Sequence, residues 1–366
     1  MNEKILEVNN HRVTFDTYAG KVQAVRGVSF YLNKGETLAV VGESGCGKSV
    51  TFQSLIKLTP SPPARIQSDS IKYNGKDIAK FTDRQMESLR GKEFSMIFQD
   101  PMTSLNPTMR VGRQITEGIR KHQQLQARAA DERAINMLKL VGIPSPQQNM
   151  LRYPHTYSGG MRQRIMIAIA LACNPNILIA DEPTTALDVT MQAQILELMN
   201  DLKDKLDTAI VLITHDLGVV ARMAQRVAVM YAGQIVETGR SEDIFYTPRH
   251  PYTWGLLGSM PMVGAQESNK LNAIPGTPPD LFAPPPGCAF AARCPHCLEV
   301  CREVAPPEFE VGVGHKAACW LLDSRAPKVA PPRFERHKFT SVEVSETQDG
   351  TLAVRVEKRG GASDGH

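Results

Sequence analysis

The sequence lacks any long apolar segment and any strong excess of charge. No run reaches the roughly 18 apolar residues that a membrane-spanning helix needs, so no segment crosses a bilayer alone. The net charge of +4 is too small to indicate nucleic acid by itself. The first residues, MNEK, lack the apolar core of a signal peptide. These absences predict a chain that works in the cytosol, or on the cytosolic face of a membrane through partners, without nucleic acid.

Strand-like and helix-like segments alternate along the first two thirds of the chain. Three short apolar runs, Thr37–Val41, Asn176–Asp181 and Thr208–Thr214, are typical of buried central strands. Residues 104–172 are richer in helix-forming side chains and predict a helical insertion. Strands that alternate with helices favour an α/β fold with a parallel sheet.

A glycine-rich loop follows the first of these buried strands. Residues 42–49, GESGCGKS, fit the pattern G-x-x-x-x-G-K-S of a P-loop. Glycines let main-chain N–H groups turn toward phosphates, and the N-terminus of the next helix attracts the same negative charge. We expect Lys48 to reach the β- and γ-phosphates and the Ser49 hydroxyl to bind Mg²⁺. The predicted phosphate-binding set is Gly42, Ser44, Gly45, Cys46, Gly47, Lys48, Ser49 and Val50, with Cys46 as a small filler.

Two adjacent acids end the second buried strand, in the segment NILIADEP. Open α/β sheets bind ligands at the carboxyl ends of their strands, and neighbouring strand residues point to opposite sides. The two acids can therefore have different tasks. We expect Asp181 to serve Mg²⁺, mostly through water, and Glu182 to polarise the attacking water as general base. The alternative is an exposed acidic turn.

A Ser-Gly-Gly sequence precedes an apolar helix 18 residues before NILIAD. Ser158, Gly159 and Gly160 could hold a phosphate at the helix N-terminus, although the motif alone is also typical of a plain helix cap. Together with the upstream P-loop, it resembles the signature of the ATP-binding cassette (ABC) family. In that family the signature of one subunit covers the ATP held by the P-loop of the other. The resemblance implies a P-loop NTPase fold with a helical subdomain and an antiparallel β subdomain.

Further matches follow the order of that family. FQD with Gln99 resembles the Q-loop, which would contact Mg²⁺ and the attacking water and report the nucleotide state to a membrane partner. ALD with Asp188 resembles the D-loop at the dimer interface, and THD with His215 resembles the switch histidine, which would hold the γ-phosphate. An upstream aromatic normally stacks on adenine. Spacing from Lys48 favours Tyr18, with Phe15 as the rival and a core or surface role as the alternative.

One branch of the family matches residues 1 to about 325 more closely. The segments SMIFQDPMTSLNPTMRVG, YPHTYSGGMRQR, TPRHPYTWGLL and IPGTPPDL resemble the ATP-binding subunits of bacterial oligopeptide and dipeptide permeases. The resemblance implies two transmembrane permease subunits, a sister ATPase subunit and an extracytoplasmic peptide-binding protein. It places the chain peripherally at the cytoplasmic face of the cell membrane. ATP binding would close the ATPase dimer and drive the permease, and hydrolysis would reset it.

Other functions stay open at this point. The same ATPase could serve the transport of nickel complexes, glutathione or antimicrobial peptides. A soluble ABC protein acting on ribosomes or DNA is disfavoured, since the chain has one cassette and no long heptad run. A non-catalytic regulatory subunit is disfavoured by the presence of Glu182 and His215.

The composition changes after about residue 260, and this change suggests the domain boundaries. We expect a nucleotide-binding domain over 1–260, a Pro- and Cys-rich extension over 261–325, and a linker and tail over 326–366. The alternation on both sides of Asp349-Gly350 predicts a β-hairpin over 341–357.

Five cysteines lie in that extension, between positions 288 and 319. Their spacing is compatible with zinc, with an iron–sulfur cluster or with free thiols. The peptide-permease resemblance implies a [4Fe–4S] cluster on four of them, namely Cys288, Cys294, Cys301 and Cys319, with Cys297 in surplus. The expected role is structural, because the proline-rich segment has little apolar core of its own.

Overall fold

The computed structural model describes residues 3–185, 187–259, 274–332, 342–346 and 352–356. The chain divides into two compact units, Met1–Pro331 and Pro332–His366. In the part of the chain that the structure describes, no helix is long and apolar enough to cross a membrane.

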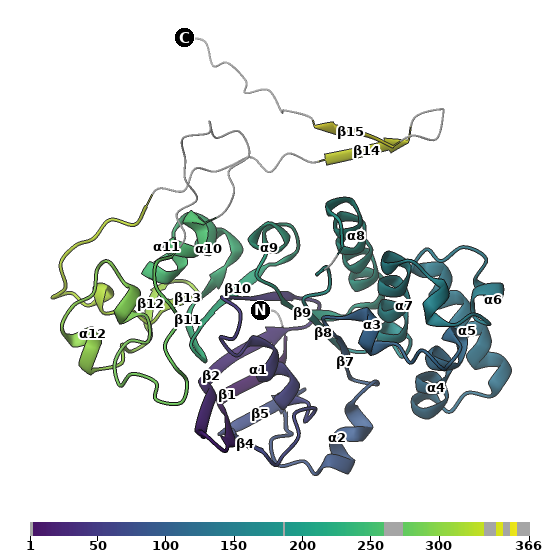
Figure 1. Ribbon diagram of the computed structural model, residues 1–366, viewed down its shortest axis with the longest axis horizontal. Coiled ribbons are helices and arrows are strands. Elements are labelled where there is room, and N and C mark those ends of the chain that lie inside the picture. Colours follow the sequence, from purple (N-terminus) through teal and green to yellow (C-terminus); the bar gives the residue numbers. More distant parts are fainter. Residues whose placement is uncertain (1–2, 186, 260–273, 333–341, 347–351, 357–366) are drawn as a thin grey trace, which may run out of the picture. The chain divides into compact units, whose positions relative to one another are not determined.

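An eight-stranded sheet forms the centre of the first unit, in the order β12-β13-β11-β10-β3-β9-β8-β7 (Figure 1). The strands from β10 to β7 run parallel, whereas β11, β13 and β12 add antiparallel pairs at one edge. Their bounds are β3 Thr37–Val41, β7 Phe94–Ile97, β8 Ile177–Asp181, β9 Ala209–Ile213, β10 Arg226–Tyr231, β11 Gln234–Arg240, β12 Phe309–Gly312 and β13 His315–Ala317. Every residue of β3, β8 and β9 is buried, which explains their uninterrupted apolar sequences.

A second, antiparallel sheet has the order β2-β1-β5-β6, with β4 also paired to β1. Its strands are β1 Lys4–Thr17, β2 Gly20–Asn33, β4 Ala64–Gln67, β5 Ser70–Tyr73 and β6 Lys76–Asp77. Helix α1 (Lys48–Leu55) contributes Phe52 and Leu55 to a core shared with apolar residues of both sheets. This core fixes the start of α1, and therefore the P-loop, against the end of β3.

Helices α4 to α7 gather at the right of Figure 1 and pack against α3, α8 and strand β7 through one apolar cluster. In α4 the residues Val111, Ile115 and Ile119 are buried at intervals of four, which gives the helix one apolar face. The bounds are α3 Pro101–Ser104, α4 Val111–Gln123, α5 Ala127–Leu140, α6 Pro146–Asn149, α7 Gly159–Leu171 and α8 Val189–Leu206. The remaining helices are α2 Asp83–Leu89, α9 Leu217–Met223, α10 Ser241–Tyr246, α11 Pro251–Gly258 and α12 Val300–Glu303, with 3₁₀ turns η1 Pro154–Thr156, η2 Ala291–Arg293 and η3 Trp320–Leu322.

The second unit contains an antiparallel pair of strands, β14 (Val342–Glu346) and β15 (Leu352–Val356). Val342 pairs with Val356, and Glu346 pairs with Leu352. The connecting residues 347–351 of the predicted hairpin, and its end positions 341 and 357, lie outside the described residues.

The prediction of an iron–sulfur or other metal site at the cysteines is wrong. Among the described residues, which include all five clustered cysteines, no group of three or more His, Cys, Asp or Glu side chains is arranged to hold a metal ion. All five are free thiols. Burial raises the pKa of Cys294 to about 11 and that of Cys319 to about 12.

Strand pairing and side-chain packing, rather than a metal, attach the cysteine-containing segment to the rest of the first unit. Strand β13 pairs with β11, so the segment extends the central sheet. Phe290 is 2% exposed and its ring lies 5.3 Å from the ring of Tyr231 and 5.4 Å from that of Tyr252, between centroids. These long-range contacts leave no local trace in a proline-rich sequence, so they could not be predicted from it.

Candidate active site

The P-loop connects the end of β3 to α1 with a tightly turned main chain. Gly42 has φ +155° and Gly47 has φ +97°. A Cβ at Gly42 would lie 2.1 Å from the carbonyl oxygen of Met230, and one at Gly47 would lie 2.3 Å from that of Ala24. The loop therefore presses on the main chain of β10 and β2, and only glycine fits at these two positions.

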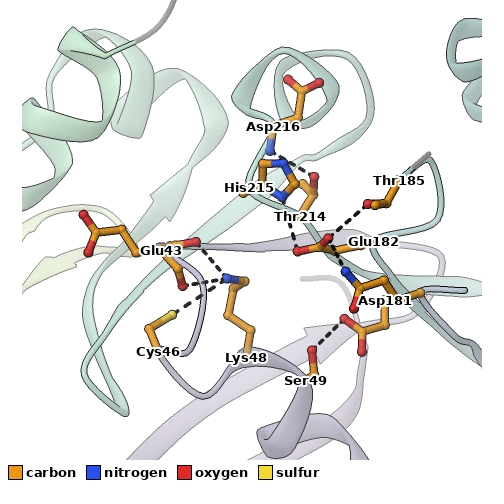
Figure 2. A network of polar contacts seen from close by, with 12 residues as sticks. Glu43, Cys46, Lys48, Ser49, Asp181, Glu182, Thr185, Thr214, His215 and Asp216 are labelled. Atoms are coloured by element: carbon orange, nitrogen blue, oxygen red, sulfur yellow. Dashed lines mark hydrogen bonds and ion pairs between the residues drawn. The ribbon is translucent and has the colours of Figure 1, made fainter. Parts of the chain in front are cut away.

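Lys48 points back into the loop that precedes it (Figure 2). Its ammonium donates hydrogen bonds to the carbonyl oxygens of Gly42, at 2.7 Å, and Glu43, at 2.9 Å, and the residue is 6% exposed. Cys46 is buried 3.9 Å from the same ammonium, and burial raises the pKa of its thiol. Ser44 and Gly45 lie exposed at the outer turn of the loop. The ammonium thus lies inside the curve where phosphates would be held.

Ser49 and Asp181 bring two oxygen ligands together. Ser49 Oγ donates to Asp181 Oδ1 at 2.8 Å, across 132 positions of the sequence. Asp181 is 4% exposed, and burial raises the pKa of its carboxyl. Hydroxyl and carboxylate oxygens are the ligands that Mg²⁺ prefers. The donor set therefore fits Mg²⁺ beside the phosphates.

The Glu182 carboxylate meets three side chains, of which Gln99 and His215 come from distant parts of the chain and Thr185 from the same turn. Gln99 Nε2 and Thr185 Oγ1 each donate to its Oε2 at 3.0 Å, and His215 Nδ1 lies 3.2 Å from its Oε1. Glu182 has φ +47°, a left-handed conformation that a non-glycine residue adopts at a cost. Its side chain is 16% exposed and that of His215 is 65% exposed. The carboxylate is thus oriented, yet open to a water molecule and to substrate (Figure 2).

His215 follows β9 and precedes α9. Its neighbour Asp216 caps α9 by accepting hydrogen bonds from the main-chain amides of Gly218 and Val219. Gln192 of α8 also donates to Asp216 at 2.9 Å. These contacts fix the turn that carries the histidine.

The Ser-Gly-Gly sequence forms the start of α7. Ser158 is the N-cap, and its Oγ accepts from the amide of Met161 at 3.4 Å. A Cβ at Gly159 would meet nothing within 4 Å, whereas one at Gly160 would lie 2.1 Å from Met191 Cε of α8. Gly160 therefore allows α7 and α8 to approach, and the open side at Gly159 leaves room for a ligand or a second chain.

The remaining predicted positions lie at the edges of the site. Asp188 caps α8 through a hydrogen bond from the amide of Met191 at 2.9 Å, and Ala186 lies outside the described residues. Tyr18 is fully exposed in the turn between β1 and β2. Phe15 packs against the core beside it. Tyr18 is therefore the more exposed of the two aromatics, and Phe15 is partly buried.

Comparison with known proteins identifies the chain. Residues 25–185 match the family described as ABC transporter, and residues 236–301 match the C-terminal region of oligopeptide/dipeptide transporters. The chain is 58% identical to the oligopeptide transport ATP-binding protein OppD of Bacillus subtilis, covering 92% of this chain and 94% of that protein. The chain belongs to this family of ATP-binding subunits of peptide ABC transporters.

Other members and solved cassettes agree with this assignment. The dipeptide transport ATP-binding protein DppD of Bacillus subtilis is 56% identical over 88% of this chain and 96% of its own length. OppD of Salmonella typhimurium is 50% identical over 86% of this chain and 93% of its own length. The fold resembles the dimeric ATP-binding cassette MJ0796 bound to ADP and Pi, with a TM-score of 0.58 at 23% identity, over 64% of this chain and 98% of the cassette. The family, the cassette fold and the ATPase class predicted from the sequence are confirmed.

Several residues of this family member's site carried no recognised signal in the sequence. Thr185 holds Glu182, although the motif DEPTTALD gave it no role. Tyr252 Oη accepts from the main-chain amide of Glu43 at 2.9 Å, and Arg293 forms an ion pair with the Glu43 carboxylate. Tyr252 and Arg293 are more than 200 positions from Glu43, so no local pattern could have found them.

Proposed function

We propose that this chain is the ATP-hydrolysing subunit of a membrane importer for oligopeptides or dipeptides, acting at the cytoplasmic face of the cell membrane. The observation that carries the proposal is the convergence of Gln99, Thr185 and His215 on the Glu182 carboxylate, beside a P-loop lysine and a Ser49–Asp181 pair. The OppD and DppD relatives, which are named as oligopeptide and dipeptide transport ATP-binding proteins, support the substrate class.

Phosphate binding would begin at Lys48. Its ammonium exchanges the carbonyl oxygens of Gly42 and Glu43 for the β- and γ-phosphates, while the amides at the start of α1, including those of Ser49 and Val50, point at the same charge. Tyr18 would stack on the adenine. Ser49 and Asp181, with Gln99 nearby, would hold Mg²⁺, which supplies charge neutralisation at the phosphates when bound.

Hydrolysis would depend on Glu182 as general base. A carboxylate that is oriented by three partners is prepared to take a proton from the attacking water. His215 lies on the Oε1 side, where its ring can also reach the γ-phosphate. Positioning of this kind accounts for most catalysis in phosphoryl transfer.

A second ATPase chain would complete the site. Ser158, Gly159 and Gly160 at the start of α7 would cover the ATP held by the P-loop of a partner, and Asp188 would lie at that interface. The dimeric form of the solved cassette supports such pairing. We propose a sister ATPase subunit as the partner, together with two transmembrane permease subunits and an extracytoplasmic peptide-binding protein.

The proposed domain organisation places the nucleotide-binding domain over residues 1–260, with the helical subdomain near 104–172. A C-terminal segment over 261–325 follows, and a linker and tail over 326–366 end the chain. The antiparallel pairing of β14 with β15 supports the hairpin assigned to the tail.

The test is the Glu182→Gln variant, which keeps the shape of the side chain and removes its basicity. We expect Mg-ATP hydrolysis to fall by roughly 10²- to 10⁴-fold, the usual size of a general-base contribution, while ATP binding persists. The matched control is Lys48→Ala, which should lose binding as well. Hydrolysis by Glu182→Gln at the wild-type rate would refute the assignment of the base.

The trapped variant also tests the assembly. Tagged Glu182→Gln, held with Mg-ATP in native membranes, should co-purify with two permeases, a second ATPase and a peptide-binding protein, and Lys48→Ala should show no ATP-dependent enrichment. Recovery with ribosomes, DNA or no membrane protein would contradict the transport function.

A further inference from the structure

A partly buried ion pair joins the P-loop to the C-terminal segment. Arg293 Nη1 lies 2.7 Å from Glu43 Oε2, and Arg293 Nη2 lies 2.9 Å from Glu43 Oε1. Two parallel bonds of this kind are the strongest and most directional form of an arginine–carboxylate contact. The Arg293 side chain is 5% exposed and that of Glu43 is 26% exposed. The second residue of the P-loop is therefore bound to η2, which lies 250 positions later in the chain.

Arg293 is itself fixed by its own segment. Its Nε donates to the carbonyl oxygen of Pro275 at 2.9 Å, and Nη2 donates to that of Ile274 at 3.2 Å. Nη1 also donates to the hydroxyl of Tyr231 at 3.2 Å. The hydrogen bonds to Glu43 raise the pKa of the guanidinium, which remains a cation. A side chain held at so many points cannot swing away from the P-loop without breaking several bonds.

Glu43 makes contacts through three separate groups, and these contacts connect Arg293 to the rest of the P-loop. Its carboxylate binds Arg293, its amide donates to Tyr252 Oη at 2.9 Å, and its carbonyl accepts from Lys48 Nζ at 2.9 Å. Figure 2 shows Glu43, Lys48 and the hydrogen bond from the Lys48 ammonium to the Glu43 carbonyl oxygen. Arg293 of the C-terminal segment thus contacts Glu43, and Glu43 contacts Lys48, the lysine proposed to bind the phosphates.

We propose that Arg293 is a positioning residue for ATP binding, which acts through Glu43 to hold the P-loop in the shape that accepts phosphates. The C-terminal segment then sets the affinity of the subunit for ATP without touching it. A loop that is held in its binding shape loses less conformational freedom when the ligand arrives. The inference rests on the proposed function, since it assigns a control to the same ATP site.

The test is a double-mutant cycle in the full chain, with Glu182→Gln as the background so that ATP is not consumed. We expect Glu43→Gln and Arg293→Met each to raise the Kd for Mg-ATP by roughly ten- to a hundredfold, the effect of a small displacement at a site. The double variant should bind about as weakly as either single variant, since both remove one contact. The matched control is Arg302→Met, an exposed arginine of the same segment, which should bind ATP as the background does.

A second readout separates positioning from a general loss of structure. With Glu182 restored, the KM for ATP should rise while kcat at saturating ATP stays within about twofold, and Arg293→Lys should recover part of the affinity. Unchanged Kd in both single variants, or effects that add in the double variant, would overturn the inference. If Arg293→Met does not fold, wild-type affinity in Glu43→Gln alone would overturn it. Failure of the unmodified chain to bind ATP would instead refute the proposed function.

Discussion

Single residues in this protein do several jobs at once, and Glu182 is the clearest case. It directly follows the buried strand β8 in a left-handed conformation and contacts Gln99, His215 and Thr185. The preceding residue, Asp181, contacts Ser49 instead. One turn of chain thereby separates the residue proposed to hold Mg²⁺ from the residue proposed as general base.

Two buried histidines make the stability of the fold depend on pH. His11 is fully buried between the hydroxyls of Ser54 and Ser68, each 2.7 Å from a ring nitrogen, and His250 is 1% exposed. Burial lowers the pKa of each ring to about 4, whereas an unfolded histidine titrates near 6.5.

The free energy of unfolding should therefore fall as the pH drops from 6.5 toward 4. In that window the unfolded chain binds protons that the folded chain excludes, at a cost of up to about 3 kcal/mol for each histidine. Above pH 6.5 both states carry neutral rings and this contribution is complete. Urea denaturation at several pH values measures the slope, and His11→Gln should reduce it. Equal slopes for the variant and the wild type would contradict the role of His11.

At the scale of elements, the sequence predicted those functional segments whose pattern lies within a short stretch of consecutive residues. The P-loop between β3 and α1, the acids after β8 and the cap of α7 each combine a short pattern with an adjacent strand or helix. Each of these combinations lies in consecutive residues, so it could be found without a structure. The roles assigned to Gln99, His215 and Tyr18 came from the family resemblance and stay predictions.

The edge of the central sheet could not be predicted from the sequence. Strand β13, which has only three residues, pairs with β11 across more than seventy positions, and β12 in turn pairs with β13. Their place depends on Glu237, whose fully buried carboxylate accepts from His315 Nε2 at 2.8 Å and from the amides of Arg249 and His250. Cysteine spacing suggested a metal as the tie instead, which was wrong.

Removal of the Glu237 carboxylate should loosen this edge of the sheet. Glu237→Leu leaves two amides and a histidine buried without an acceptor, with an expected loss of about 3–5 kcal/mol in the free energy of unfolding. Glu237→Gln keeps one acceptor oxygen and should lose less. Thr238→Val, on the next and more exposed position of β11, should change stability by no more than about 0.5 kcal/mol. Urea denaturation compares the three variants, and a Glu237→Leu value close to that of Thr238→Val would refute the role of the carboxylate.

At the scale of the whole molecule, the first unit combines a P-loop with a Ser-Gly-Gly sequence at the start of another helix, α7. Lys48, the Ser49–Asp181 pair and the Glu182–His215 pair lie in one site (Figure 2). Ser158 caps its own helix beside an open position at Gly159. In the proposed function, one chain offers one half of each of two ATP sites. An enzyme built in this way works as part of an assembly, as the peptide-transporter family does.

The most direct test of the central claim is peptide uptake in cells that carry this chain. Uptake of labelled di- and oligopeptides is measured after deletion of the chain and after its return as wild type, Glu182→Gln or Thr238→Val. The account predicts that deletion abolishes ATP-dependent uptake of at least one peptide class, and that wild type and Thr238→Val restore it while Glu182→Gln does not. Uptake that persists after deletion, or that Glu182→Gln restores fully, would contradict the claim that hydrolysis at Glu182 drives peptide import.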